Sequence, residues 1–123
     1  MSTNKIIRVY GIPSCDTVKK ARNWLTEHGM PYEFHDFKKL GVPDGKLALW
    51  MQSLGWEKLT NRQGTTWRKL DPALQASVTD AASATPVLQA HVSAIKRPIV
   101  EWADGSLTVG FKVEDWDAAQ RKP

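Results

Sequence analysis

The sequence predicts an α/β domain in which a strand, a helix and a strand open the chain and two strands and a helix close it. Three observations support this class. A β-branched and aromatic run over 6–10 precedes a helical pattern, and an Asp-Gly step near residue 105 separates two further apolar runs. The segment between them has helical periodicity. We therefore expect a single domain over 1–123 with a helical insertion over approximately 41–95.

The opening segment predicts a parallel β-α-β unit. After the first strand, residues 11–14 form a turn, and apolar residues then recur at the spacing of one buried helix face. They are Val18, Ala21, Trp24 and Leu25. Gly29-Met30-Pro31 ends this helix, and residues 32–37 predict a second strand. Strand, helix and strand this close together favour a right-handed crossover between parallel neighbours.

The middle of the chain predicts helices on both sides of an irregular stretch. Asp44 is expected to cap a helix that Gly55 ends, with a buried face made of Leu47, Trp50, Met51 and Leu54. Residues 56–70 show no clear period and are expected to be irregular, with an exposed turn at 61–64. Asp71-Pro72 and Thr85-Pro86 each pair a cap residue with proline and predict the starts of two short helices.

The last part of the chain predicts a hairpin and a helix. Residues 99–102 and 107–109 are apolar runs around Asp104-Gly105, and the final helix carries Val113 and Trp116. The complete order is that of a thioredoxin-like fold, with a mixed four-stranded sheet and a helical insertion in the middle. Periodicity by itself leaves other α/β layouts open.

Composition narrows the classes of function. The net charge of +4 is scattered along the chain, which does not favour nucleic acid and suits a small anionic substrate. One cysteine excludes an internal disulfide, and no charged-then-apolar leader or long apolar run opens the sequence. We therefore expect a cytoplasmic protein that does not engage a membrane. His28, His35 and His91 have no cysteine or carboxylate at ligand spacing, so no metal is expected.

Cys15 is the candidate nucleophile. A lone cysteine is most often a small buried hydrophobe, but this one lies in a polar strand-to-helix turn. At a helix N-terminus the unpaired N–H groups favour an anion, and Lys19 and Lys20 follow one turn later. We expect the pKa of the thiol to be lower than that of a free cysteine. Thr17 is expected to cap the helix, with a hydrogen bond to the thiolate as the alternative.

Three separated strings resemble the arsenate-reductase-like family that includes the Spx regulators, and above all its small YffB-type branch. They are GIPSCDTVKKA at the first strand-helix junction, LTNRQGTTWRKL in the middle, and KRPIVEW before the hairpin with GFK after it. The resemblance runs nearly end to end and implies the thioredoxin-like fold. It also implies that Cys15 is the nucleophile, that Arg62 and Arg97 bind an anion, and that the peptide bond before Pro98 is cis.

Two departures from the family bear on function. The family's arsenate reductases have a third arginine after the hairpin, where this chain has Val109-Gly110-Phe111-Lys112. The Spx branch has Cys-x-x-Cys, and Val18 stands at the second position here. A lone nucleophilic cysteine needs an external thiol to release its adduct.

We therefore expect a glutathione-dependent thiol or mixed-disulfide reductase with glutathione as co-substrate. Arg62, Arg97, Pro98 and Thr17 are the expected glutathione-binding residues around Cys15. Arsenate reduction on the same fold is the first alternative. An Spx-like protein that binds a transcription complex without turnover is the second, so a protein partner stays open.

Overall fold

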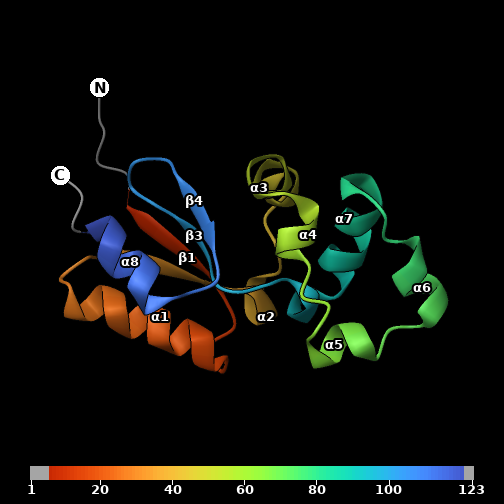
Figure 1. Cartoon of the computed structure of the whole chain (residues 1–123), viewed down its shortest axis with the longest axis horizontal. Helices are drawn as coiled ribbons and strands as arrows, with labels where there is room; N and C mark the ends of the chain where they lie inside the picture. Colours follow the sequence, from red (N-terminus) through yellow and green to blue (C-terminus); the bar gives the residue numbers. More distant parts are fainter. Residues whose placement is uncertain (1–5, 121–123) are drawn as a thin grey trace. The chain divides into compact units, whose positions relative to one another are not determined.

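The computed structural model describes residues 6–120 and divides into two compact units. Residues 1–5, part of the N-terminus where no leader is expected, lie outside the described residues, as do 121–123. The first unit joins Met1–His35 to Arg97–Pro123, and the second consists of Asp36–Lys96 (Figure 1).

A four-stranded sheet forms the first unit, which confirms the predicted α/β class. Its order is β2-β1-β3-β4, with β1 at Ile7–Gly11, β2 at Tyr32–Asp36, β3 at Ile99–Glu101 and β4 at Leu107–Val109. β3 pairs antiparallel with both β1 and β4. β1 reaches its neighbour β2 through α1 (Asp16–Glu27), the kind of connection that parallel neighbours require.

Helices α1 and α8 (Val113–Gln120) lie along the same face of this sheet (Figure 1). The four apolar residues predicted for α1 are the four that it buries. The core beneath the helices consists of Ile7, Val9, Ala21, Trp24, Leu25, Val100 and Trp116. The Trp116 ring meets Trp24, Trp102 and Phe111 edge-on, at centroid distances of 5.2, 4.9 and 4.6 Å. These T-shaped contacts join α1, the hairpin and α8.

The hairpin turns where Asp104-Gly105 predicts it. Gly105 has φ +92°, a conformation that glycine adopts without strain. The Asp104 carboxylate accepts a hydrogen bond from the Ser106 N–H at 2.9 Å, and the Trp102 N–H donates to the Ser106 carbonyl at 2.9 Å. Local chemistry therefore determines this connection.

The second unit consists of short helices among the residues that the structure describes. They are α2 (Phe37–Leu40), α3 (Lys46–Leu54), α4 (Trp56–Leu59), α5 (Thr65–Arg68), α6 (Pro72–Ser77), α7 (Ala81–Ala90) and the 3-10 turn Val92–Ala94. An isolated bridge pairs Thr60 with Ile95, flanked by hydrogen bonds from Lys96 N–H to the Leu59 carbonyl at 2.7 Å and from Asn61 N–H to the Ala94 carbonyl at 2.8 Å. This pairing places the turn at 61–64 beside residues 94–96, the last residues of the second unit.

Two helix starts differ from the prediction. Helix α3 begins after Gly45, which has φ +80° and no capping side chain, so Asp44 is not its cap. Helix α7 begins at Ala81 and not at Thr85, and Pro86 lies inside it. Asp80 and Ser83 form a reciprocal capping box, with hydrogen bonds of 2.8 and 3.0 Å between side chain and backbone. Because the box satisfies donors at the true start, it outweighs the signal from proline.

The expectation that 56–70 is irregular is wrong. This stretch contains α4 and α5, whose four residues each are too few to show a helical period, and buries Leu59 and Trp67. Phe37, expected at a strand end, begins α2, because the Asp36 carboxylate accepts from the Lys38 N–H at 2.9 Å. The predictions of a turn at 61–64 and of a helix start at Asp71-Pro72 are confirmed.

Candidate functional site

Cys15 lies at the N-cap of α1, as the sequence predicts. Its backbone is extended, with φ −75° and ψ 125°, and its carbonyl accepts the first helical hydrogen bond, from Lys19 N–H at 2.9 Å. Its own N–H donates to the Ile12 carbonyl at 3.0 Å and closes the turn after β1. The side chain is half-buried. The thiol is therefore reachable and faces the positive end of the helix dipole.

The surroundings of Cys15 lower the pKa of its thiol. Burial is the largest influence and raises that pKa, but it is outweighed by the backbone N–H of Val18, by the Arg97 side chain and by the backbone N–H of Thr17. Both N–H groups belong to the first turn of α1, where the helix has no partner of its own for them. The thiolate is thus favoured by two separate sources, a helix start and a guanidinium.

Strand pairing brings Arg97 and Pro98 to the same place. Tyr10 of β1 pairs with Ile99 of β3, so one more step along this register sets Pro98 opposite Gly11. Arg97 and Pro98 are joined by a cis peptide bond, as the resemblance implies. Pro98 is buried, and its carbonyl accepts the Gly110 N–H at 2.8 Å. This arrangement sets the Arg97 side chain beside the sulfur of Cys15.

Thr17 lies in the first turn of α1 and is half-buried. It influences the thiol through its backbone N–H, and its hydroxyl makes no hydrogen bond within the described part of the chain. Cys15, Thr17, Arg97 and Pro98 therefore lie together in the first unit. Their binding roles stay predictions.

Arg62 belongs to the second unit, on the turn at 61–64. Its side chain is exposed, and its guanidinium lies over two indole rings, 5.1 Å from the centroid of Trp56 and 5.9 Å from that of Trp67. Sequence reasoning assigned no role to Trp56 or Trp67 and missed this contact. TTWRKL places Trp67 near Arg62 in the chain, but only the folded turn shows that the ring faces the guanidinium.

Two of the three histidines pack against aromatic residues. His28 stacks on Trp24 at a centroid distance of 3.8 Å, and His35 lies 5.1 Å from the Tyr10 ring. Between residues 6 and 120 no group of three or more His, Cys, Asp or Glu side chains is arranged to hold a metal ion. Over the same range, no helix has the length and apolar character needed to cross a membrane.

Comparison with known proteins assigns the family. The profile of the ArsC family matches residues 10–119, a range that includes Cys15, Arg62 and Arg97. The chain belongs to the ArsC family. Among curated relatives of this ArsC-family chain, an uncharacterized protein of Haemophilus influenzae is 40% identical over 114 residues, which cover 93% of this chain and 98% of that protein. A global transcriptional regulator Spx of Listeria innocua is 27% identical over 112 residues, covering 89% and 83%.

Solved structures of ArsC relatives share the fold. A YffB protein is 45% identical with a TM-score of 0.85, and the match covers 92% of this chain and 97% of that one. An arsenate reductase related protein from Brucella melitensis is 44% identical with a TM-score of 0.73, covering 96% and 97%. An arsenate reductase from Vibrio cholerae, 18% identical with a TM-score of 0.70, covers 84% and 87% and supports the fold alone. The thioredoxin-like fold class is thereby confirmed.

Proposed function

We propose that this protein is a glutathione-dependent thiol or mixed-disulfide reductase in which Cys15 is the nucleophile. The observation that carries the proposal is the placement of Cys15 at the start of α1 beside Arg97, with the pKa of its thiol lowered. The thiolate is the attacking form in exchange with a disulfide, so a fold that favours it favours this chemistry.

The first step is attack of the Cys15 thiolate on one sulfur of a mixed disulfide that contains glutathione. A bond forms between Sγ of Cys15 and the glutathione sulfur, the original S–S bond breaks, and the other sulfur leaves as a thiolate that takes a proton from water. Arg97 carries a planar guanidinium that suits a carboxylate of glutathione. The same positive charge also favours the attacking thiolate.

The second step needs a thiol from outside the chain, because the sequence contains one cysteine. A glutathione thiolate attacks the glutathione sulfur of the adduct and forms oxidised glutathione. The bond to Cys15 breaks, and Sγ leaves as the thiolate. Glutathione thus supplies the electrons of each cycle.

Arsenate reduction is the second candidate, because a solved relative that is 44% identical is named as related to arsenate reductase. Binding a tetrahedral oxyanion requires several hydrogen-bond donors that converge on one small anion. At the place of the third arginine this chain has Lys112, which is exposed and carries a compact charge on a flexible stem. We therefore place thiol exchange first.

Mass spectrometry of the purified protein tests the proposal. After exposure to oxidised glutathione, one glutathione should be bound at Cys15, and an excess of reduced glutathione should remove it. Cys15→Ser should form no adduct. Efficient turnover of arsenate without any glutathione adduct would reverse the order of the two candidates.

A pull-down from cell extract tests the class of non-catalytic regulators, which the Spx relatives represent. Wild-type protein and Cys15→Ser are compared under reducing conditions. If both variants capture the same transcription-complex subunits and neither supports thiol exchange, the reductase proposal fails.

A further inference from the structure

The ends of three strands of the first unit meet at Pro98. The register that joins β1, β3 and β4 through Ile99 continues by one residue, which sets Pro98 between Gly11 of β1 and Gly110 after β4. Figure 1 shows these three strands side by side. Pro98 directly follows Arg97, the arginine that acts on the thiol. A contact that fixes Pro98 therefore bears on the position of this arginine.

Gly110 holds Pro98 by a backbone hydrogen bond. Proline has no N–H group, so the carbonyl is the one backbone group through which its neighbours can hydrogen-bond to Pro98. The Gly110 N–H donates to this carbonyl at 2.8 Å. Pro98 is fully buried, so water does not compete for the carbonyl, and a buried acceptor that loses its donor is costly. The bond therefore restrains Pro98.

The backbone of Gly110 has a conformation that other residues rarely adopt. Its φ is +84°, and it lies between β4 and α8. On the helix side the chain is fixed by Phe111, whose ring meets the Trp116 ring at a centroid distance of 4.6 Å. On the strand side it is fixed by the pairing of β4 with β3. A side chain at this position would strain φ, and relief by rotation at residue 110 would turn its N–H away from Pro98.

Pro98 passes its position on to the residue before it. The ring holds φ of Pro98 at about −65°, so one rotatable backbone angle separates its carbonyl from the peptide bond to Arg97. Burial raises the pKa of the Cys15 thiol, whereas the helix N–H groups and the Arg97 side chain lower it. The influence of a guanidinium on a thiolate weakens with distance. A displaced Pro98 carbonyl should therefore weaken the influence of Arg97.

We propose that Gly110 is a positioning residue for the reaction of Cys15, because its N–H holds the Pro98 carbonyl and thereby keeps the Arg97 side chain beside the sulfur. Gly110 contributes no side chain to the site, so its effect passes through Arg97. The inference rests on the proposed function only for the role of Cys15 as the nucleophile. Its direct consequence is a dependence of thiol reactivity on the conformation of the chain after β4.

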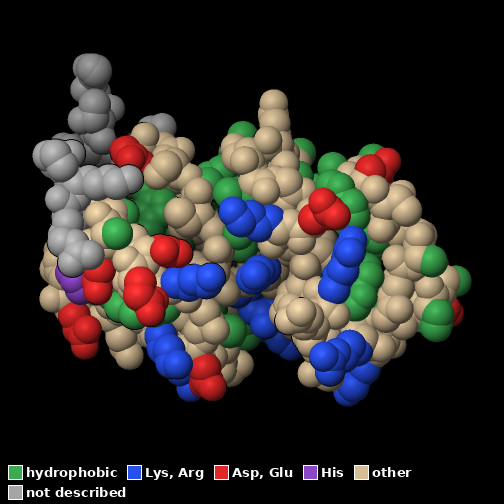
Figure 2. All heavy atoms as spheres, viewed as in Figure 1, with side chains coloured by type: hydrophobic (Ala, Val, Ile, Leu, Met, Phe, Trp, Pro, Cys, Tyr) green, Lys and Arg blue, Asp and Glu red, His purple; other side chains and the backbone are tan. Residues whose placement is uncertain are grey.

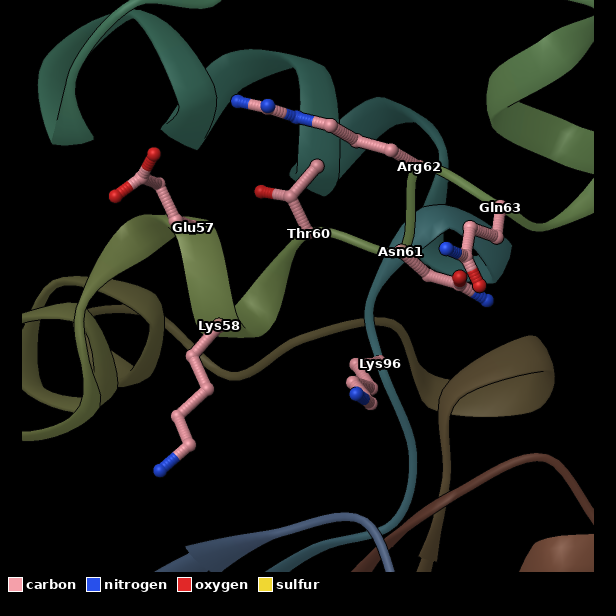
Figure 3. Close-up of a pocket in the computed structure, with 7 residues that line it drawn as sticks. All are labelled: Glu57, Lys58, Thr60, Asn61, Arg62, Gln63 and Lys96. Atoms are coloured by element: carbon pink, nitrogen blue, oxygen red, sulfur yellow. The ribbon is translucent and has the colours of Figure 1, made fainter.

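The polar cavity of the second unit does not take part in this proposal. It has a volume of about 240 Å³ and is lined by residues between Glu57 and Gln63 and by Lys96 (Figure 3). Arg62 is part of this lining. Gly110 belongs to the first unit, so a substitution there leaves every residue of the lining unchanged. A change in reactivity is then assigned to the surroundings of the thiol.

The pH dependence of iodoacetamide alkylation at Cys15 tests the proposal without glutathione. Gly110→Ala should have a higher midpoint than the wild type, though not higher than that of Arg97→Ala. Gly110→Asn should have a midpoint between those of the wild type and Gly110→Ala, because asparagine adopts a positive φ more readily than alanine. Circular dichroism over the same pH range verifies that each variant is folded.

Two controls separate position from stability and from general charge. Gly105→Ala places a side chain at a φ of +92° in the same hairpin, but the Gly105 N–H donates to the Trp102 carbonyl. This variant should therefore lose stability and keep the wild-type midpoint. Figure 2 shows Lys and Arg side chains at many places on the visible face. Arg8→Ala removes a cation that is not among the groups acting on Cys15, and it should also keep the wild-type midpoint.

A double variant and a spectroscopic titration show whether Gly110 acts through Arg97. Gly110→Ala/Arg97→Ala should have the midpoint of Arg97→Ala alone, because no guanidinium is left to position. In the wild type, the nuclear magnetic resonance signal of the Gly110 amide should shift as the Cys15 thiol ionises, with the same midpoint. This shift should shrink in Arg97→Ala, because coupling between two groups acts in both directions.

The proposal is overturned if Gly110→Ala keeps the wild-type midpoint, if Gly105→Ala raises the midpoint as much, or if the double variant exceeds Arg97→Ala. If Gly110→Ala does not fold, a wild-type Gly110 amide signal that does not respond to ionisation of the thiol overturns it. Failure of the proposed function has a different signature. In that case no glutathione adduct forms on Cys15, while the alkylation midpoints keep the expected order.

Discussion

Gly11 ends β1 and Val18 lies in α1, and the two approach so closely that a Cβ atom on Gly11 would lie 2.8 Å from Cγ2 of Val18. Val18 is fully buried, so its side chain has little room to move away. This contact sets the distance between the strand and the helix that together present Cys15. The absence of a side chain at Gly11 is therefore a requirement of packing.

Gly11→Ala should destabilise the protein by about 1–3 kcal/mol, the usual effect of overpacking a core. Urea denaturation followed by tryptophan fluorescence measures the change. The double variant Gly11→Ala/Val18→Ala should be more stable than the sum of the two single effects predicts, because the smaller side chain makes room for the added methyl group. If the effects of the two substitutions on stability were strictly additive, the contact with Val18 would not be the cause of the destabilisation.

Arg97→Ala should raise the pKa of the Cys15 thiol. Burial, which raises that pKa, is opposed by the helix N–H groups and by the Arg97 side chain, and the substitution removes the second of these. The rate of iodoacetamide alkylation, measured against pH, should have a midpoint below that of a free cysteine in the wild type and a higher midpoint in the variant. Arg8→Ala is the matched control, since it removes a cation of the same unit that is not among the groups acting on Cys15. Equal midpoints for wild type and Arg97→Ala would contradict the assignment.

Because the pKa of Tyr10 is raised in the folded protein, the free energy of unfolding should fall at alkaline pH. Burial, and then the carboxylate of Glu101 that accepts its hydrogen bond at 2.9 Å, raise the pKa of Tyr10 from 10.0 to about 12. Between these values the unfolded chain releases the phenol proton and the folded protein keeps it, so the free energy of unfolding falls as pH rises. The full shift corresponds to about 2–3 kcal/mol. Below pH 10 the contribution is fully present.

Denaturation of Tyr10→Phe across this pH range measures the contribution. Its free energy of unfolding should fall less steeply than that of the wild type. Glu101→Gln keeps a hydrogen-bond acceptor but removes the charge. The steepness of its decline should lie between that of the wild type and that of Tyr10→Phe. A decline in Tyr10→Phe as steep as in the wild type would assign the alkaline effect to other groups.

Trp116→Ala should destabilise the protein by about 3–5 kcal/mol, because a buried ring that contacts three other aromatic rings leaves a large cavity. Trp116→Phe keeps part of the edge-to-face packing and should recover a substantial share of the loss. Differential scanning calorimetry gives the comparison. A small effect of Trp116→Ala would mean that α8 contributes little to the first unit.

The sequence predicted correctly those helices and turns that are determined by residues close together in the chain. The helix after Cys15 buries the four residues that its spacing indicates, and Asp104-Gly105 turns the hairpin, because periodicity and turn preference act over short distances. The short helices α4 and α5 were missed because one turn of helix depends on tertiary burial of Leu59 and Trp67. Helix α7 starts at the capping box of Asp80, whereas the proline at 86 had indicated a later start.

The candidate nucleophile can be identified without a structure, since one cysteine stands before a helical pattern, and a thiol that releases an adduct from it must then come from another molecule. Which charges act on which groups depends on how the chain folds. The pairing of β1 with β3 brings Arg97 to Cys15 from the far end of the chain, and the bridge between Thr60 and Ile95 brings Lys96 to Arg62. The physical reason is that hydrogen-bonded pairing joins segments distant in sequence, and its register is set by the whole core, beyond any local pattern.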